Sequence, residues 1–119
     1  MCPEKKDKDC VFCKIIGGEI PSKILYRDED IVVFPDINPI TPVHLLVVTR
    51  KHIPSLAQMS DAETALVGKM VIAANRVARE QGIAGKGYRL TINSGADSGQ
   101  IVPHLHAHLM GGRQLRWDH

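Results

Sequence analysis

Polar and apolar residues alternate most regularly at residues 104–110, whose sequence is His-Leu-His-Ala-His-Leu-Met. Successive side chains of a β-strand point to opposite faces, so this period of two predicts a strand with one buried face. The histidines would share one face at intervals of about 7 Å, because a strand rises about 3.4 Å per residue. Leu105, Ala107 and Leu109 would occupy the other face.

Four further β-rich runs precede this one. Residues 23–27 and 30–34 are separated by a short acidic stretch, which predicts a β-hairpin, and Pro35 would end its second strand. Residues 43–49 are apolar almost throughout, so they predict a strand that is buried on both faces. Residues 88–92 form the fourth run.

Residues 60–81 carry the period of an amphipathic helix instead. Ser60 and Glu63 have the spacing of a capping box at its start, and Gly82 is a natural stop after its end. Shorter helical turns are expected at residues 10–16 and after Pro54. The apolar stripe of the long helix comprises Ala62, Leu66, Met70, Ala73 and Val77, flanked by Val67, Val71, Ala74 and Ala78.

These elements predict an α+β domain, in which an antiparallel sheet packs against one long helix. A length of 119 residues suits one domain with one core. Residues 1–9 are highly charged and lack any periodicity, so we expect a flexible tail followed by a single domain at 10–119.

Composition excludes several functional classes. The hydrophobic share of 44% and the charged share of 24% are those of a soluble globular protein. A net charge of +2 permits an anionic ligand but gives no dense basic stripe, so no nucleic-acid partner is expected. No apolar run is long enough to cross a membrane, and residues 1–9 lack the apolar core of a secretory signal. Three cysteines, an odd number, favour a reducing compartment, so the expected location is the cytoplasm.

The three histidines of residues 104–110 require a function. Imidazoles titrate near neutral pH and repel one another when charged, so a row of them is costly in a purely structural strand. They can ligate a metal, or they can act as nucleophile and acid or base towards a phosphate. The loop at residues 93–100 has two glycines and short polar residues, a composition that lets backbone N–H groups converge on an anion. This loop leads into the histidines, which favours phosphoryl or nucleotidyl transfer. No cluster of aspartates accompanies it, so we do not expect the reaction to require Mg²⁺.

Residues 104–110 also match the pattern His-φ-His-φ-His-φ-φ, with φ apolar, and so the chain resembles the histidine triad (HIT) superfamily. Residues 111–114 (Gly-Gly-Arg-Gln) and Trp117 are similar to its Hint branch, the nucleoside phosphoramidases. Short segments at residues 18–21, 34–37 and 87–89 also match the family, which extends the resemblance over most of the chain. The resemblance implies a five-stranded antiparallel sheet and a homodimer.

The resemblance implies a hydrolase that cleaves the P–N bond of purine nucleoside phosphoramidates, such as adenosine phosphoramidate or AMP-lysine. His106 would attack phosphorus to give a nucleotidyl-histidine intermediate. His108 would donate to the phosphoryl oxygens, and His104 and His44 would complete the catalytic set. The implied nucleotide-binding residues are Asp36 for the ribose, Ile20, Phe34 and Ile37 for the base, and Asn93, Gly99, Gln100, Ile101 and Val102 for the phosphate.

Three of these assignments have alternatives. Asp36 also fits a turn aspartate before an Asn-Pro sequence, and Phe34 and Ile37 also fit the core. Ile101 departs from the family, which often has a hydroxyl residue associated with the leaving group at this position. An isoleucine has no proton to donate, so a slower or differently selective enzyme is one expected consequence.

Cys10 and Cys13 form a C-x-x-C motif, which fits zinc, free thiols or a disulfide. A subset of the superfamily completes a Cys₂His₂ zinc site with residues that correspond to His52 and His104. Four protein ligands leave no open position, so such a zinc would be structural. Cys2, in the tail, is expected to be incidental.

Two other functions remain open at the level of sequence. The histidines of the triad would be the ligands of a catalytic metal in a metal-dependent hydrolase. Alternatively, the chain would be a nucleotide-binding interaction module with vestigial turnover, a possibility that Ile101 supports.

Overall fold

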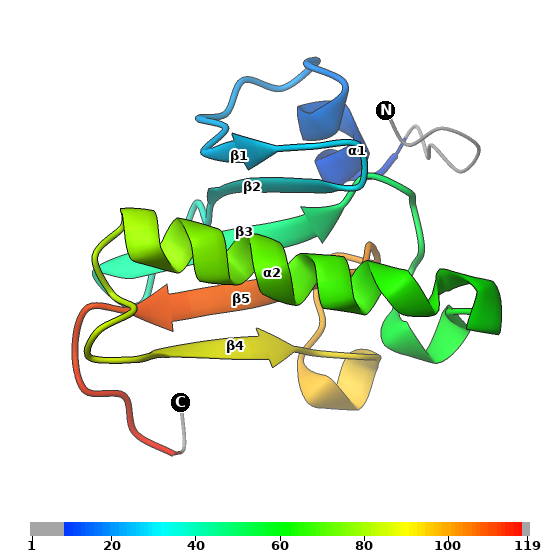
Figure 1. The fold of residues 1–119 in the computed structure, drawn as a ribbon. Coiled ribbons are helices and arrows are strands. Elements are labelled where there is room, and N and C mark those ends of the chain that lie inside the picture. The colour runs from blue at the N-terminus through cyan, green and yellow to red at the C-terminus, as the bar shows by residue number, and fades with distance from the viewer. Residues whose placement is uncertain (1–8, 118–119) are drawn as a thin grey trace.

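The computed structural model describes residues 9–117, and the expected tail, including Cys2, lies outside this part except for Asp9. A five-stranded antiparallel sheet of order β1-β2-β3-β5-β4 confirms the predicted α+β fold (Figure 1). Its strands are β1 (Tyr26–Arg27), β2 (Ile31–Pro35), β3 (Val43–Thr49), β4 (Tyr88–Ile92) and β5 (His106–Gly111). The helices are α1 (Val11–Ile16) and α2 (Thr64–Glu80), with 3₁₀ turns η1 (Leu56–Gln58), η2 (Asp61–Glu63) and η3 (Ala96–Ser98).

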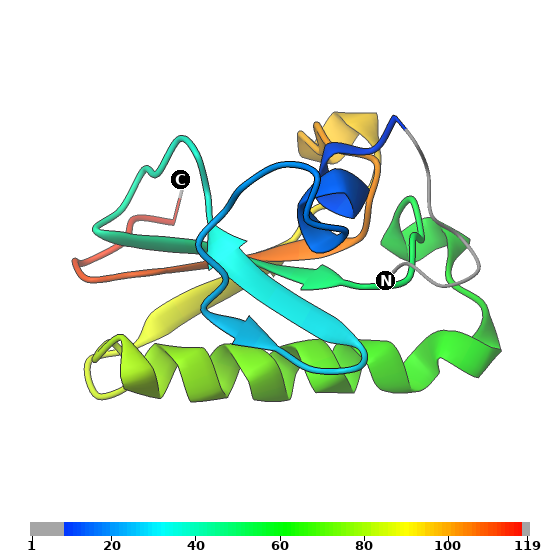
Figure 2. The ribbon, with the colours of Figure 1, turned by 90° about the horizontal axis from the view of Figure 1, so that it is seen from above.

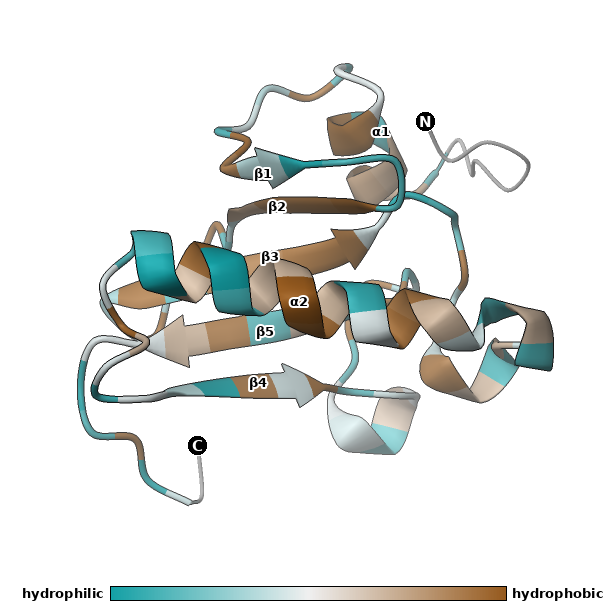
Figure 3. Cartoon of the chain, viewed as in Figure 1, coloured by the Kyte–Doolittle hydropathy of each residue, from teal (hydrophilic) through white to brown (hydrophobic). Residues whose placement is uncertain are grey.

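The sheet is covered on both faces, by α2 on one side and by α1 and the η3 loop on the other (Figure 2). Alternation along the strands divides the core accordingly. On β3, Leu45 and Val47 pack with α2, whereas Leu46 and Val48 pack with α1. Because β2 and β3 need apolar residues at every position, both strands are hydrophobic almost throughout (Figure 3).

The prediction that all three triad histidines lie on one strand is wrong for His104, because β5 begins only at His106. The preceding Pro103 has no N–H to donate to a ladder, and the chain turns there, with the His104 N–H donating to the Val102 carbonyl at 2.8 Å. Leu105 then donates to the Ile53 carbonyl at 2.6 Å. The ring of His104 is therefore placed by a turn.

The long helix starts and stops at the predicted signals. The Ser60 N–H donates to Glu63 Oε1 at 2.8 Å, although the first turn is 3₁₀ and α2 proper starts at Thr64. Gly82 has φ +75° and, with Ile83, closes a Schellman-type end. Ala62 of the predicted stripe and Val71 of its flank are exposed instead of buried. The buried face comprises Met70, Ala73, Ala74, Val77 and Ala78.

None of the helices in residues 9–117 combines the length and the apolar character that crossing a bilayer requires.

Truncating Val77 should destabilise the fold without touching the opposite face of the sheet. Val77 is 0% exposed on the buried face of α2, so Val77→Ala removes two packed methyl groups and should lower the free energy of unfolding by roughly 2 kcal/mol. Denaturant unfolding followed by circular dichroism measures this change. Val11→Ala, at a valine that is 39% exposed, is the control and should change the free energy of unfolding by less than half as much. Equal losses in the two variants would contradict this account of the core.

Candidate active site

A cavity of about 700 Å³ opens on the α1 face of the sheet, within the size range of small-molecule sites. His106 and His108 lie in its wall, whereas His44 and His104 do not. Trp117 is 96% exposed and does not line the cavity of its own chain. The cavity brings together every expected nucleotide-binding residue, namely Ile20, Phe34, Asp36, Ile37, Asn93, Gly99, Gln100, Ile101 and Val102.

A backbone contact fixes which nitrogen of His106 is available for chemistry. Nδ1 of His106 lies 2.6 Å from the carbonyl oxygen of His104. A carbonyl only accepts hydrogen bonds, so Nδ1 carries the proton, and Nε2 of the neutral ring keeps its lone pair. Nε2 is therefore the nitrogen that can act as a base or nucleophile in the cavity.

The tautomer of His108 is fixed in the same way through His44. The backbone N–H of Ile40 donates to His44 Nδ1 at 3.1 Å, so the proton of the neutral His44 ring is on Nε2. This Nε2 lies 2.9 Å from His108 Nδ1 and 3.3 Å from Asp36 Oδ2. His108 Nδ1 thus accepts a hydrogen bond, and its proton is on Nε2, where it can be donated to a ligand.

Both cavity histidines are held in the neutral form. Burial lowers the pKa of His106 below its ordinary value of 6.5, against the opposing effect of the His104 carbonyl. Burial also lowers the pKa of His108, and the neighbouring rings of His106 and His44 add to this effect. One ring with a lone pair and one ring with an N–H donor therefore face the same cavity at neutral pH.

The loop before β5 provides backbone donors, although fewer than its composition predicts. Gly99 donates its N–H to the Ala96 carbonyl at 3.0 Å, and Gln100 donates to the Gly95 carbonyl at 3.3 Å. The side chain of Gln100 also braces the loop, donating to the Pro54 carbonyl at 2.8 Å. Within the described residues, the backbone N–H groups of Ile101 and Val102 have no acceptor, so these two are available to an anion.

The structure bears on the alternatives for Phe34, Ile37 and Asp36, which all line the cavity. Phe34 is 2% exposed, so it is a core residue whose ring also forms the cavity wall. Ile37 is 90% exposed, which excludes the core alternative for that residue. Asp36 does act as a turn aspartate, since its Oδ1 accepts the Asn38 N–H at 2.8 Å, yet it also lines the cavity.

Helix α1 supplies a part of the cavity wall that the sequence analysis missed. Val11, Phe12 and Ile15 line the cavity, as does the cationic Lys23 after the helix. The Phe12 ring packs edge-on against His106, with 5.0 Å between ring centroids. The sequence holds one signal for Phe12, which is its position between Cys10 and Cys13. A motif that fixes the two cysteines also fixes the residue between them.

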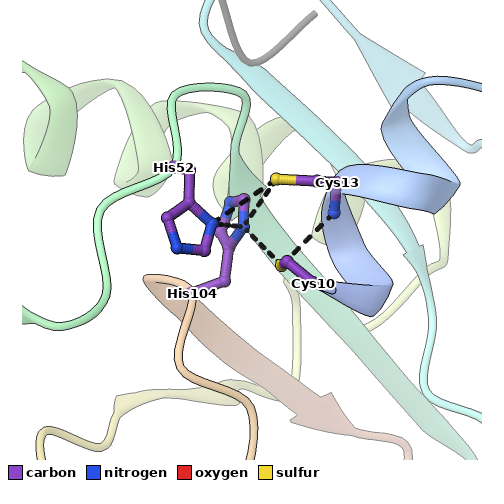
Figure 4. Close-up of side chains that lie close together, drawn as sticks. All are labelled: Cys10, Cys13, His52 and His104. Atoms are coloured by element: carbon purple, nitrogen blue, oxygen red, sulfur yellow. Dashed lines mark hydrogen bonds between the residues drawn. The ribbon is translucent and has the colours of Figure 1, made fainter. Parts of the chain in front are cut away.

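The predicted cluster of Cys10, Cys13, His52 and His104 is assembled in the structure (Figure 4). Cys10 Sγ lies 3.2 Å and Cys13 Sγ 3.7 Å from His104 Nδ1, and His52 Nδ1 lies 3.4 Å from Cys13 Sγ. The two Nδ1 atoms are 3.1 Å apart. Sulfur and nitrogen ligands on a tetrahedral zinc lie about 3.5 Å apart, so this spacing fits a metal. Neither cysteine is in a disulfide.

The protonation of the cluster also suits a cation. His104 Nε2 donates to the Thr49 carbonyl at 2.6 Å, which leaves the lone pair on Nδ1 facing the sulfur atoms. Burial lowers the pKa of His104 to about 4 and raises the pKa of the Cys10 thiol to about 11. A buried thiolate at Cys10 therefore requires a positive charge beside it, which a bound metal ion would supply.

A sequence model of the HIT domain matches residues 17–115. The chain belongs to the HIT domain family. The uncharacterized HIT-like protein slr1234 of Synechocystis is 44% identical over 110 residues, which cover 92% of this chain and 96% of that protein. The HIT family hydrolase from Clostridium thermocellum is similar in structure, with a TM-score of 0.90 and 44% identity over 92% of this chain and 96% of that chain.

Two other solved structures of histidine triad proteins are similar to this chain. A histidine triad nucleotide-binding protein from Candida albicans has a TM-score of 0.72 and 30% identity, covering 92% of this chain and 82% of that chain. A zinc-bound histidine triad family protein from Mycobacterium smegmatis has a TM-score of 0.75 and 32% identity, covering 88% of this chain and 76% of that chain.

Proposed function

We propose that this HIT protein is a purine nucleoside phosphoramidase-type hydrolase that works through a nucleotidyl-histidine intermediate on His106. The observation that carries the proposal is the 2.6 Å contact between His106 Nδ1 and the His104 carbonyl, which leaves Nε2 unprotonated in the cavity wall. The similarity to the HIT family hydrolase from Clostridium thermocellum supports hydrolysis as the reaction class. The nucleotide-binding protein from Candida albicans supports the class of ligand.

In the first step, His106 Nε2 attacks phosphorus, and a P–N bond to the ring forms as the bond to the amine breaks. The neutral ring begins without a proton on Nε2, so no base is needed to activate it. His108 Nε2–H donates to the phosphoryl oxygens, where negative charge develops. The departing amine takes up a proton from solvent. The side chain of Ile101 has no proton to give, so it assists the departure of the amine less than a hydroxyl side chain at this position would.

In the second step, water attacks the same phosphorus and loses a proton to solvent, while His106 leaves with the electron pair of the P–N bond, which restores the neutral ring. The Nδ1–H bond to the His104 carbonyl stabilises the ring while it carries positive charge as phosphohistidine. The His108 donor serves both steps, because His44 holds its Nδ1 in the accepting state throughout. The products are the nucleoside monophosphate and the free amine.

The remaining cavity residues would bind the nucleotide. The carboxylate of Asp36 would accept hydrogen bonds from the ribose hydroxyls, and Phe34 and Ile37, with Ile20, would contact the base. The unpaired N–H groups of Ile101 and Val102 would donate to the phosphate. Asn93, Gly99 and Gln100 border the same region of the cavity.

We also propose that Cys10, Cys13, His52 and His104 bind one structural zinc ion. The four donor atoms, their spacing and their burial support this assignment, as does the zinc-bound relative from Mycobacterium smegmatis. Four protein ligands would close the coordination shell, so the ion would contribute to folding and leave the phosphorus chemistry to the histidines of the cavity.

The geometry disfavours a catalytic metal held by the histidine triad. His104 Nδ1 is directed at the cysteines, whereas His106 belongs to neither group of potential ligands in the described residues. The other group is formed by Asp36, His44 and His108, and in it Nε2 of His44, which would have to bind the metal, carries a proton. His44 Nδ1 accepts from Ile40, so its Nε2 has no lone pair to offer.

A homodimer is the expected assembly, and two features of the fold support it. Strand β4 is at one edge of the sheet, so a second chain can pair with it. On α2, Ile72 is 59% and Val71 39% exposed. Val71 precedes Asn75 by one turn, and Asn75 accepts a hydrogen bond from Tyr88 of β4, so Val71 lies on the β4 side of the helix.

His106→Asn should abolish turnover, because the amide nitrogen has no lone pair with which to attack phosphorus. Affinity for AMP should stay within a few-fold of wild type, since the cavity keeps its other walls. Intact-protein mass spectrometry after a rapid quench with adenosine phosphoramidate should detect one added adenylyl group in the wild type only. Arg79→Ala, at an exposed position of α2, is the control and should adenylylate normally. An active His106→Asn protein would refute the covalent mechanism.

The rate of adenylylation should fall on acidification, because only the neutral ring attacks. Burial lowers the pKa of His106 below its ordinary value of 6.5, so the midpoint of this decline should lie below pH 6.5. Single-turnover kinetics at saturating substrate measure this profile. A rate that rises between pH 7 and 5 would contradict a neutral imidazole nucleophile.

The purified protein should contain close to one zinc ion per chain, and Cys10→Ser should lower this content because it removes one of four ligands. Elemental analysis by mass spectrometry measures both values. Cys2→Ser is the matched control for loss of a thiol and should retain the wild-type content. A metal-free wild-type protein that was purified without chelator would reject the zinc assignment.

Val71→Glu should convert the dimer to a monomer, because a charge would be buried in the interface. Sedimentation equilibrium should give the mass of two chains for the wild type and of one chain for the variant. Glu80→Gln, at the exposed end of the same helix, should remain dimeric. A monomeric wild-type protein at micromolar concentration would contradict the assembly.

A further inference from the structure

We propose that the cluster of Cys10, Cys13, His52 and His104 positions the nucleophilic ring of His106, so that metal binding at the cluster is coupled to nucleotide binding. This inference rests on the proposed role of His106. The cluster would then position His106 as well as stabilise the fold. His104 and Phe12 would be positioning residues, which hold the ring of His106 in place and do not react themselves.

The first connection runs through His104, which belongs to both places. Its Nδ1 faces the sulfur of Cys10 at 3.2 Å, and its Nε2–H is held by the Thr49 carbonyl at 2.6 Å. Its own carbonyl oxygen accepts the Nδ1–H of His106 at 2.6 Å. Ligation by the ring therefore fixes the residue whose carbonyl sets the tautomer of His106.

The second connection runs through Phe12, which stands between Cys10 and Cys13 on α1. The ring of Phe12 is 5% exposed and packs edge-on against the rings of both His104 and His106, with centroid distances of 5.8 and 5.0 Å. It also packs against Phe34 at 5.6 Å. A shift of α1 therefore moves a ring that is in contact with the nucleophile.

Helix α1 is an element whose position depends on such tethers. It has 6 residues, whereas an isolated helix shorter than about 12 residues is marginal in water. Cys13 on the helix contacts His52, which follows β3, and Cys10, the N-cap of the helix, contacts His104, which precedes β5. Val11, Phe12 and Ile15 form one wall of the cavity, so loss of the tether loosens both the wall and the ring beside His106.

Thermodynamic linkage makes the coupling reciprocal. If zinc at the cluster strengthens AMP binding by some factor, AMP must strengthen zinc binding by the same factor. This second effect is measured at the metal and requires no turnover. A cluster that acts only as a structural tether, with no effect on the cavity, would give a factor of one in both directions.

The test compares the full chain loaded with zinc and stripped by a chelator, at pH 8, where circular dichroism verifies that both forms are folded. Stripping should weaken AMP binding, measured by calorimetry, about tenfold, which corresponds to about 1.4 kcal/mol. Saturating AMP should tighten zinc binding by the same factor in a chelator competition. Long-range ¹H–¹⁵N NMR should show His106 protonated on Nδ1 in the loaded form and a mixture of tautomers in the stripped form.

Two controls separate coupling from general loosening. Val77→Ala destabilises the core on the other face of the sheet and should leave the tautomer of His106 and the affinity for AMP unchanged. Cys2→Ser should match the wild type in every measurement. Identical AMP affinity and an identical His106 tautomer in the loaded and stripped forms would overturn the proposal and leave the cluster a purely structural site.

Phe12→Leu keeps the test decisive if the stripped protein unfolds. This variant preserves an apolar side chain and all four cluster residues, so it should retain zinc while the Nδ1–H tautomer of His106 becomes less populated. Loss of AMP affinity alone would reflect the place of Phe12 in the cavity wall, so the tautomer decides: an unchanged tautomer would overturn the proposal. Adenylylation is not needed for these measurements, so a failure of the proposed reaction is recognised separately, by the absence of adenylyl-protein.

Discussion

The candidate site depends on one hydrogen bond, from the Nδ1–H of His106 to the carbonyl of His104. A neutral imidazole has one proton and two nitrogens, so fixing the proton at one nitrogen frees the other. The His104 carbonyl is available because the chain turns at Pro103 before it enters β5, and the ring of His104 is held in turn by Thr49 and the cysteines. The reactivity of one ring thus depends on where a backbone oxygen two residues earlier points.

The tautomer of His108, the second cavity histidine, is also fixed by the backbone, but here the backbone group is a donor and not an acceptor. The Ile40 N–H acts on His44, and His44 acts on His108, so the two cavity rings end in opposite states. Burial keeps both neutral by penalising the charged form. A lone pair and an N–H donor then face one cavity without either group having to exchange a proton with solvent first.

Side-chain pattern predicted most of the fold but not the contacts that determine the tautomers. Residues 43–49 and 88–92 are strands as their composition indicates, and Gly82 ends α2 because its positive φ suits only glycine at low cost. The cluster of Cys10, Cys13, His52 and His104 was anticipated only through resemblance to a family. The carbonyls of Thr49 and His104 and the N–H of Ile40 have no signature in the sequence, because every residue but proline carries the same backbone groups. Phe12 was missed for a related reason, since an aromatic residue in a short helix looks like ordinary core.

The division of the sheet into two faces has a consequence for how this protein can change. Because neighbouring residues of β3 belong to different layers, Leu45 can be exchanged with compensation from α2 while Leu46 and the cavity beneath α1 stay as they are. Tolerance of heat and choice of substrate are therefore separate traits that selection can adjust one at a time. A laboratory variant with a rebuilt α2 layer should therefore keep His106 and His108 in the wall of the cavity.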